Sequence, residues 1–310
     1  MPVVIRKMIR KIEKVWSRSI LKIYWLVYSH IPRWKGITGT EYPEEIIVSL
    51  TSFPARIRVA EEAVKTLLMQ KQKPNHIILW LAKEQFPQRE ENLPGTLLRL
   101  QRYGLEIKWC DDICSYKKLI PTLDLYPESV IITADDDLYY RREWLKVLYD
   151  EYLKKKDMIC AHRITKLYLE GNSYKVVAGG YDTWPEATYL HKLTGGGGTL
   201  YPPHVLDENV LNKEIFMDRC PTNDDIWFWF MAVLHGTKIC VPQKANPGLI
   251  YVRGTQKGPT LSSINDKGDM LFWKDFYNML NLYPSVDKIF REEYKKLIYQ
   301  GELKVEKDNF

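Results

Sequence analysis

The chain has 310 residues, of which 45% are apolar and 27% are charged, and its net charge is +6. That apolar content supports a full-sized core, so it excludes an intrinsically disordered protein, and the length allows one large α/β domain or two small ones. Residues 1–36 hold nine Lys and Arg against one acid, a net +8, while the remaining residues hold 36 bases and 38 acids, a net −2. A body that binds nucleic acid should itself be basic, so no nucleic acid partner is expected. The five cysteines include no Cys-x-x-Cys pair, which argues against a disulfide scaffold or a structural zinc site and favours a reducing compartment.

Residues 1–36 have the pattern of a basic amphipathic helix. Seven Lys and Arg side chains between Arg6 and Lys22 fall within one helical arc of about 160°, with apolar side chains opposite them. The apolar stretch is shorter than the roughly 20 residues that span a bilayer, and it has no small-residue cleavage site. We therefore expect a helix that ends before Pro32 and lies on an anionic membrane surface. The alternative is a helix that docks on the body or on a second chain.

From residue 45 onward, strand-like and helix-like runs alternate. Strands are predicted at 45–50, 76–81, 105–109 and 129–133, and helices at 59–70, 97–103 and 115–125, the last of them regular only up to Pro121. This repetition predicts an α/β fold with a mostly parallel central sheet and helices on both faces. Ligands bind beyond the carboxyl ends of the strands in such sheets, so the loop 51–56 and the aspartates 135–137 should share one cleft.

The second half of the sequence is less regular. Strands are predicted at 158–161, 175–178 and 237–241, with a short strand after the glycine run 195–198, and helices from Pro221 and over most of 268–299. The run Trp227–Phe230 is expected in the core, because both faces of its helix are apolar. Trp184 is a candidate for stacking on an acceptor sugar, and His162 and His191 are expected to be ordinary polar residues. The glycine run would let backbone approach a substrate closely, or it is a flexible turn.

Three consecutive aspartates, Asp135 to Asp137, follow the fourth predicted strand. Adjacent carboxylates repel one another, and a divalent cation removes that cost. Hard oxygen ligands suit Mg²⁺ or Mn²⁺, which commonly complete their coordination with waters and substrate phosphates. The alternative is that one aspartate caps the helix beginning near Arg141 and the others are solvated.

Four motifs in the same order carry a family resemblance. They are VSLTSFPAR at 48–56, LLMQ at 67–70, IITADDD at 131–137 and TNDD at 222–225. Together they resemble the GT-A-fold glycosyltransferases, and are similar to bacterial family 2-type enzymes of cell-surface polysaccharide and lipopolysaccharide assembly. Two departures from that family are Asp-Asp in the last motif, where Glu-Asp is commoner, and the lack of any histidine after His235, which removes a metal ligand of some relatives.

The resemblance implies a nucleotide-sugar donor and a Mn²⁺ or Mg²⁺ cofactor. Asp137 would bind the metal together with Asp135, which would also hold the ribose or the donor sugar, while Asp136 lies between them. Residues of the first motif would line the nucleotide pocket, namely Thr51, Pro54 and Arg56, with Arg56 able to pair with a phosphate or stack on the base. Lys117 and Lys118 lie between the third strand and these aspartates, where a cation could meet the diphosphate, or they are solvated helix lysines. Asp111 and Asp112 follow the third strand, and one of them, with Asp112 as the candidate, would lie near the base or ribose, or both belong to a turn and helix cap.

The resemblance also implies the reaction. Asp225 would take a proton from the acceptor hydroxyl as that oxygen attacks the anomeric carbon, with Asp224 as the alternative base. The expected function is therefore a metal-dependent glycosyltransferase of the hexosyltransferase type, which moves a sugar from a UDP-sugar to a glycan or lipid-linked acceptor with inversion. The competing interpretations are a membrane-attached scaffold that keeps a transferase-like fold without activity, and a metal-dependent phosphatase.

The expected organisation combines these segments. Residues 1–36 form the membrane-surface helix, residues 37–266 the GT-A catalytic domain, and residues 267–310 a helical segment that packs on it. Within the domain, residues 45–140 form the nucleotide-binding half and residues 141–266 the acceptor half. The protein is expected on the cytoplasmic face of the plasma membrane as a peripheral protein, where a dissolved donor can meet a lipid-linked acceptor.

Overall fold

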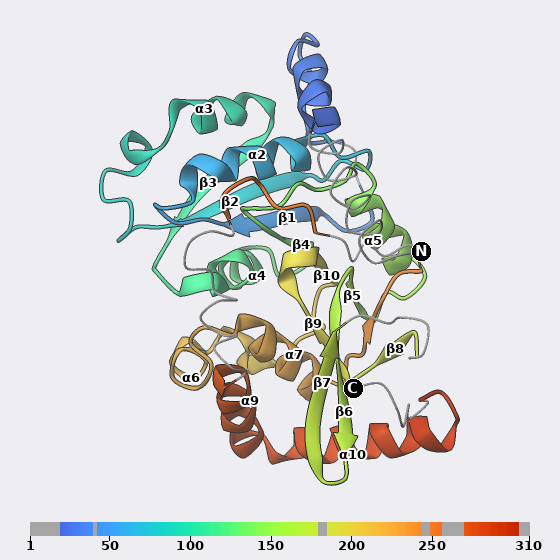
Figure 1. Cartoon of the computed structure of the whole chain (residues 1–310). Coiled ribbons are helices and arrows are strands. Elements are labelled where there is room, and N and C mark those ends of the chain that lie inside the picture. Colours follow the sequence, from blue (N-terminus) through green and yellow to red (C-terminus); the bar gives the residue numbers. More distant parts are fainter. Residues whose placement is uncertain (1–18, 40–41, 179–184, 244–248, 256–269, 304–310) are drawn as a thin grey trace, which may run out of the picture.

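A computed structural model describes residues 19–39, 42–178, 185–243, 249–255 and 270–303. The predicted α/β fold with a mostly parallel central sheet is confirmed (Figure 1). The sheet has eight strands in the order β3-β2-β1-β4-β10-β5-β11-β8. Their bounds, in that order, are Leu105–Cys110, His76–Ala82, Ile46–Thr51, Val130–Asp135, Thr199–Tyr201, Ile159–Ala161, Ile239–Cys240 and Ala187–Thr188.

Strand directions decide which strand ends meet at one edge. Strands β3, β2, β1 and β4 are joined by parallel ladders. Strand β10 is antiparallel to both β4 and β5, so β5 runs in the same direction as β4, and β11 is parallel to β5. The carboxyl ends of β1 to β5 therefore lie at one edge of the sheet, where α/β proteins bind their ligands.

The alternation of residues along β1 sends side chains to two different cores. Ile46, Val48 and Leu50 pack with one set of helices, which are α2 (Ile57–Leu68), α3 (Gly95–Leu98) and α5 (Trp144–Tyr152). Ser49 points to the other face, where its hydroxyl lies 2.8 Å from the hydroxyl of Thr122 in α4 (Ile120–Leu125). This hydrogen bond satisfies a buried polar group between strand and helix.

Three predicted helices differ in detail from the structure. The prediction that regular structure ends at Pro121 is wrong, because a 3₁₀ turn at Cys114–Lys118 (η3) is followed by α4 with Pro121 in its first turn. A proline is tolerated there because its missing N–H would have no helical partner. The predicted helix 97–103 is α3 followed by the 3₁₀ turn Arg99–Tyr103 (η2), and residues 270–299 form two helices, α9 (Met270–Leu282) and α10 (Pro284–Tyr299).

A second sheet has three antiparallel strands in the order β7-β6-β9, with bounds Ser173–Ala178, Ile164–Glu170 and His191–Leu193. Only β7 was predicted from the sequence. Further elements are α6 (Lys213–Arg219) and three 3₁₀ turns, at Arg89–Asn92 (η1), Gly195–Gly197 (η5) and Glu208–Leu211 (η6). Short strands such as β9 carry too few residues to show a period of two.

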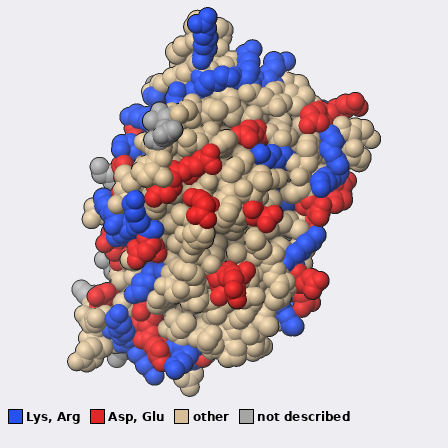
Figure 2. Space-filling model, turned by 180° about the vertical axis from the view of Figure 1, so that it is seen from behind, with Lys and Arg blue, Asp and Glu red and all other residues tan. Residues whose placement is uncertain are grey.

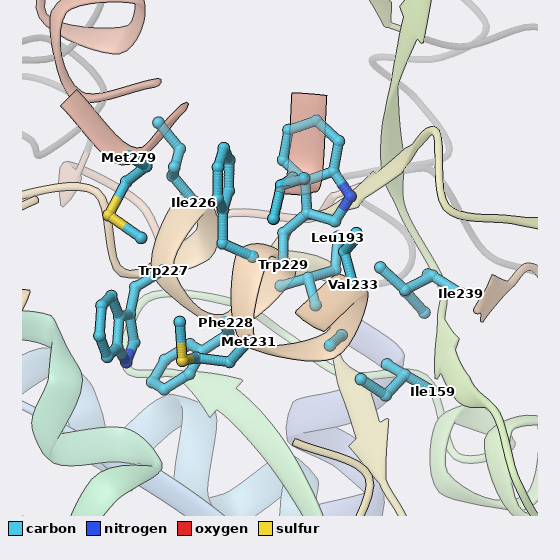
Figure 3. Packing of buried hydrophobic residues seen from close by; sticks show 14 of the residues in the cluster. Ile159, Leu193, Ile226, Trp227, Phe228, Trp229, Met231, Val233, Ile239 and Met279 are labelled. Atoms are coloured by element: carbon cyan, nitrogen blue, oxygen red, sulfur yellow. The ribbon is translucent and has the colours of Figure 1, made fainter. Parts of the chain in front are cut away.

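Helix α7 (Asp224–His235) is buried on nearly all sides and contacts strands and helices alike (Figure 3). Trp227, Phe228, Trp229 and Phe230 are each at most 1% exposed, so the prediction that this run is core is confirmed. Leu193 of β9, Ile159 of β5 and Met279 of α9 belong to the same apolar cluster. This packing holds the first turn of α7, with Asp224 and Asp225, rigidly at the sheet edge.

The described part of the N-terminal segment is helical over residues 19–29 (Figure 1), and one side of this helix packs on the body. Leu21 is 7% exposed and packs with Met69, Tyr139 and Ile250. Trp25 lies edge-on to Tyr103 at a ring distance of 5.2 Å. Across the described part of the chain, no helix is both long and apolar enough to cross a membrane.

Candidate active site

The loop after β1 and the aspartates after β4 meet at the carboxyl edge of the sheet. Thr51 and Asp135 are register partners at the ends of these strands. Ser52 donates a hydrogen bond of 2.5 Å to Asp136, and Arg56 Nη1 lies 3.2 Å from Asp136 and 3.0 Å from Asp137. Segments 80 residues apart are thus brought together by the parallel pairing of two strands.

Asp135, Asp136 and Asp137 repel one another at this edge, and Asp136 and Asp137 are buried. Burial raises the pKa of Asp136, although Ser52 and Arg56 oppose this shift. Burial and repulsion from Asp135 raise the pKa of Asp137 to about 6. Arg56 therefore compensates only part of the negative charge of these carboxylates.

Lys118 of η3 joins the two acidic motifs. Its Nζ atom lies 2.9 Å from Asp224 and 3.6 Å from Asp135. Burial alone would lower the pKa of Lys118, but the charges of Asp224, Asp135 and Asp225 together outweigh it and hold the pKa well above the ordinary value. Asp224 also accepts a hydrogen bond of 2.7 Å from Ser115, so this carboxylate is held on both sides.

Asp225 has different surroundings from its neighbour. Its side chain is 27% exposed, against 8% for Asp224. It accepts a hydrogen bond of 3.0 Å from the backbone N–H of Gly195, and Lys192 Nζ is 3.9 Å away. Burial of the carboxyl group and repulsion from Asp224 raise the pKa of Asp225. A partly open carboxylate with a raised pKa is the form expected of a general base.

The glycine run 195–198 lets the backbone lie against these side chains. A Cβ atom on Gly195 would lie 2.6 Å from Lys118 Nζ, and one on Gly196 would lie 2.8 Å from an oxygen of Asp135. Gly198 has a φ of +101°, and a Cβ there would overlap the ring of Trp144. A side chain is therefore excluded at Gly198 by its positive φ and by the ring of Trp144, whereas at Gly195 and Gly196 it would push against the ends of two flexible side chains.

Other predicted residues lie apart from these contacts. Asp112 and Lys117 form an ion pair of 2.5 Å after β3, and Lys117 is buried rather than solvated. Burial raises the pKa of Asp112, but the hydrogen bond and charge of Lys117, together with hydrogen bonds from Cys114 and Gln85, outweigh burial and lower it. The Thr51 hydroxyl donates to the carbonyl of Trp80 at 2.8 Å, and Pro54 is exposed in the loop.

The two histidines behave as ordinary core residues. His162 Nε2 lies 2.9 Å from the carbonyl of Trp144, and burial lowers its pKa to about 4. His191 Nδ1 lies 3.0 Å from the carbonyl of Ile239, and burial lowers its pKa to about 3. Both are neutral at pH 7. Trp184, the candidate for sugar stacking, lies outside the described residues.

The sequence interpretation missed Arg163 and Tyr251. Arg163 lies just beyond the carboxyl end of β5, as Asp135 lies at the carboxyl end of β4. The aliphatic part of the Arg163 side chain lies against Gly197. Arg163 hydrogen-bonds to Tyr251, and burial together with the negative charges of Asp137 and Asp135 raises the pKa of Tyr251. Within the described residues, no carboxylate forms an ion pair with Arg163, in contrast to Arg56 and Lys118. Ligands bind beyond the carboxyl ends of parallel strands, so the position of Arg163 after β5 would have indicated it if the direction of β5 had been predicted.

The residues present fit a divalent cation held by few protein ligands. Among the described residues, no three His, Cys, Asp or Glu side chains form a metal-binding group. Asp135 and Asp137 offer hard oxygen donors, which face Lys118 and Arg56 here, and burial and repulsion from Asp135 raise the pKa of Asp137. Mg²⁺ and Mn²⁺ commonly bind one or two carboxylates and take further oxygens from water and substrate phosphate.

Comparisons with known proteins give a structural likeness only. No family model matches the sequence, and no curated protein matches it. A structure of S. aureus TarS 1-349 covers 77% of this chain and 72% of its own chain, at 14% identity and a TM-score of 0.44. A structure of the same protein in complex with UDP-GlcNAc covers 82% and 73%, at 14% identity and a TM-score of 0.49. Likeness at this level does not carry an activity from TarS to this chain.

Proposed function

We propose that this protein is a metal-dependent glycosyltransferase of the GT-A type. It would move a sugar, of the hexosyl class, from a nucleotide diphosphate donor to a hydroxyl of a glycan or lipid-linked glycan. The observation that supports this proposal most directly is the single cluster formed by the aspartates after β4 and the first turn of α7, joined by Lys118. In this proposal, the aspartates after β4 would hold a cation beside a carboxylate that accepts a proton.

The donor would bind at the β1 and β4 side of the cluster. Asp135 and Asp137 would hold Mn²⁺ or Mg²⁺, which, when bound, neutralises charge on the diphosphate leaving group. Arg163 would contact a phosphate oxygen from the opposite side, because it is not paired with a described carboxylate. Arg56 would be released from Asp137 when the cation binds, and could then contact the nucleotide. The donor side would be completed by Thr51, Pro54 and Asp136, and Asp112 and Lys117 would lie further along the same edge of the sheet. UDP is the first nucleotide to test.

The acceptor would bind at the α7 side. Asp225 would accept the proton of the acceptor hydroxyl while that oxygen forms its bond to the anomeric carbon. The bond from that carbon to the diphosphate breaks in the same step, and the diphosphate leaves with the bonding electrons. A single displacement of this kind inverts the anomeric configuration. Asp224 would not act as the base, because Lys118 and Ser115 hold both of its oxygens.

Calorimetric titration tests the donor site. UDP and then GDP are titrated with and without Mn²⁺ into the wild type, Asp137→Asn and Asp150→Asn. Asp150 is a matched control, because it is an exposed aspartate of α5 that pairs with Lys146. We expect Mn²⁺-dependent binding of one nucleotide, a loss of at least tenfold in affinity for Asp137→Asn, and no change for Asp150→Asn.

Two outcomes contradict the proposal. If neither nucleotide binds under any condition, the transferase is excluded and the non-catalytic scaffold becomes the better interpretation. Release of free phosphate from the ligand, without transfer to an acceptor, would instead indicate a phosphatase. Thermal melting of each variant shows whether a loss of binding is a loss of fold.

A further inference from the structure

The helical segment 19–29 has two different sides. One side carries Leu21, Trp25 and Tyr28, which pack on the body. Arg142 lies over the ring of Tyr28 at 5.3 Å, and Lys65 lies over the ring of Trp25 at 5.7 Å. The docked side thus fixes the rotation of the helix about its axis, and it fixes which residues the helix presents outward.

The outward side is apolar and exposed. Ile20, Ile23 and Val27 are 40%, 60% and 55% exposed, and they fall within one arc of about 60° on a helix. Leu26 is 61% exposed beside them, and Ile31 is 44% exposed just after the helix. Single exposed apolar residues are ordinary on protein surfaces, but a contiguous group on one helix side marks an interaction site.

Basic side chains surround this apolar side. The Lys22 side chain is 67% exposed, with its Nζ atom 3.9 Å from Glu62 of the body, and Arg33 and Lys35 are exposed just beyond the helix. Lys35 Nζ donates to the carbonyl of Arg102, and Arg102 is itself exposed, so the body adds one basic residue at the same end. Figure 2 shows Lys and Arg side chains gathered at the end from which this segment projects. Two copies of this surface would repel each other, whereas an anionic surface would be attracted.

We infer that the outward side of residues 20–31 is a docking surface for an anionic lipid membrane. Its isoleucine, leucine and valine side chains enter the boundary between headgroups and acyl chains, and Lys22, Arg33 and Lys35 contact lipid phosphates. The docked side joins this surface to the body, so the membrane contact also sets the orientation of the whole molecule. The inference does not depend on the proposed transferase activity.

Vesicle flotation of the full-length chain tests this surface. The vesicles are neutral phosphatidylcholine, or phosphatidylcholine with about 30% phosphatidylglycerol. We expect binding to the anionic vesicles that weakens at high salt, and little binding to the neutral ones. The variant Ile23→Gln with Val27→Gln should lose about tenfold or more in partitioning. The matched control is Leu125→Gln with Leu211→Gln, at side chains that are 53% and 41% exposed on α4 and η6, and it should bind as the wild type does.

Several results would overturn the inference. They are absence of wild-type binding to anionic vesicles, equal binding to neutral vesicles, or unchanged binding of the Ile23 and Val27 variant. A dimer that this variant converts to a monomer, measured by light scattering, would assign the surface to a second copy instead. Nucleotide titration of the same variant is a separate readout, so failure of the membrane surface and failure of the donor site can be told apart.

Discussion

The two adjacent aspartates at the start of α7 differ in how far nearby groups compensate their negative charge. Asp224 pairs with Lys118 and accepts from Ser115, so its charge is compensated. Asp225 has one backbone N–H at 3.0 Å and a distant lysine at 3.9 Å, and its pKa is raised. Successive helix residues point about 100° apart, which is why neighbours in sequence can differ in this way. At the residue scale, stability and catalysis should therefore depend on different members of the pair.

Exchange of each aspartate for asparagine separates the two roles. Asp225→Asn should lower turnover by about 100-fold or more with donor affinity unchanged, because the base is lost. It should not destabilise the fold, because a carboxyl group with a raised pKa is costly to ionise inside it. Asp224→Asn should lower the free energy of unfolding by about 3 kcal/mol, because it leaves Lys118 poorly compensated.

Turnover of the wild type gives a further check. It should increase with pH through the raised pKa of Asp225, since only the ionised base accepts a proton, and this dependence should disappear in Asp225→Asn. Equal losses of turnover in the two variants, with equal stability, would contradict the division of roles. Chemical denaturation and initial-rate measurements provide both quantities.

At the element scale, the glycine run shapes the site through its backbone. Gly195 donates its N–H to Asp225, and Gly196 lies against Asp135, so one short turn contacts both acidic motifs. Trp144 of α5 donates its indole N–H to the carbonyl of Gly197 at 2.8 Å, which anchors the turn to the body. Any side chain in the run would displace the groups that it now positions.

We expect Gly196→Ala to weaken metal-dependent nucleotide binding by about tenfold. Its Cβ would lie 2.8 Å from an oxygen of Asp135, and that flexible carboxylate would have to move away. Gly95→Ala in α3 is a matched control, since nothing lies within 4 Å of its Cβ position. It should bind normally and be equally stable or slightly more stable, because alanine favours a helix. Normal nucleotide affinity in Gly196→Ala would show that the turn does not position Asp135.

At the scale of the whole molecule, the N-terminal segment is connected to the site through one apolar cluster. Leu21 packs with Tyr139, Ile250 and Val252. The backbone N–H of Val252 donates to the carbonyl of Asp137 at 2.7 Å, and that of Tyr139 donates to Ile250 at 2.8 Å. The docked helix therefore lies against the segments that flank Asp137, and it contributes to the fold of the body.

Two leucines of the same helix test this contribution. Leu21→Ala should lower the free energy of unfolding by about 2–3 kcal/mol, because it leaves a cavity against Met69 and Tyr139. Leu26→Ala should change it by less than about 0.5 kcal/mol, because that side chain is 61% exposed. Thermal or chemical denaturation measures both. Equal effects would show that the helix is not docked in solution.

The local pattern of the sequence was sufficient for the main strands. The runs at 45–50, 76–81, 105–109 and 129–133 coincide with β1 to β4 to within two residues, because buried parallel strands are continuously apolar and bounded by turn residues. The polar loop after β1 and the aspartates after β4 could be placed at one edge for the same reason. The second sheet was not predicted, since β6 and β9 have mixed patterns and pair only through distant contacts.

The sequence by itself determined the fold class, the positions of the acidic motifs and the amphipathic character of the N-terminal segment, because each depends on neighbours within a few residues. Only the tertiary structure decided which charges are paired. It placed Lys118 between two motifs, Arg56 on Asp136 and Asp137, and Arg163 at the same edge through the antiparallel strand β10. Charge pairing and burial depend on distances between segments far apart in the chain, and no local pattern encodes those distances.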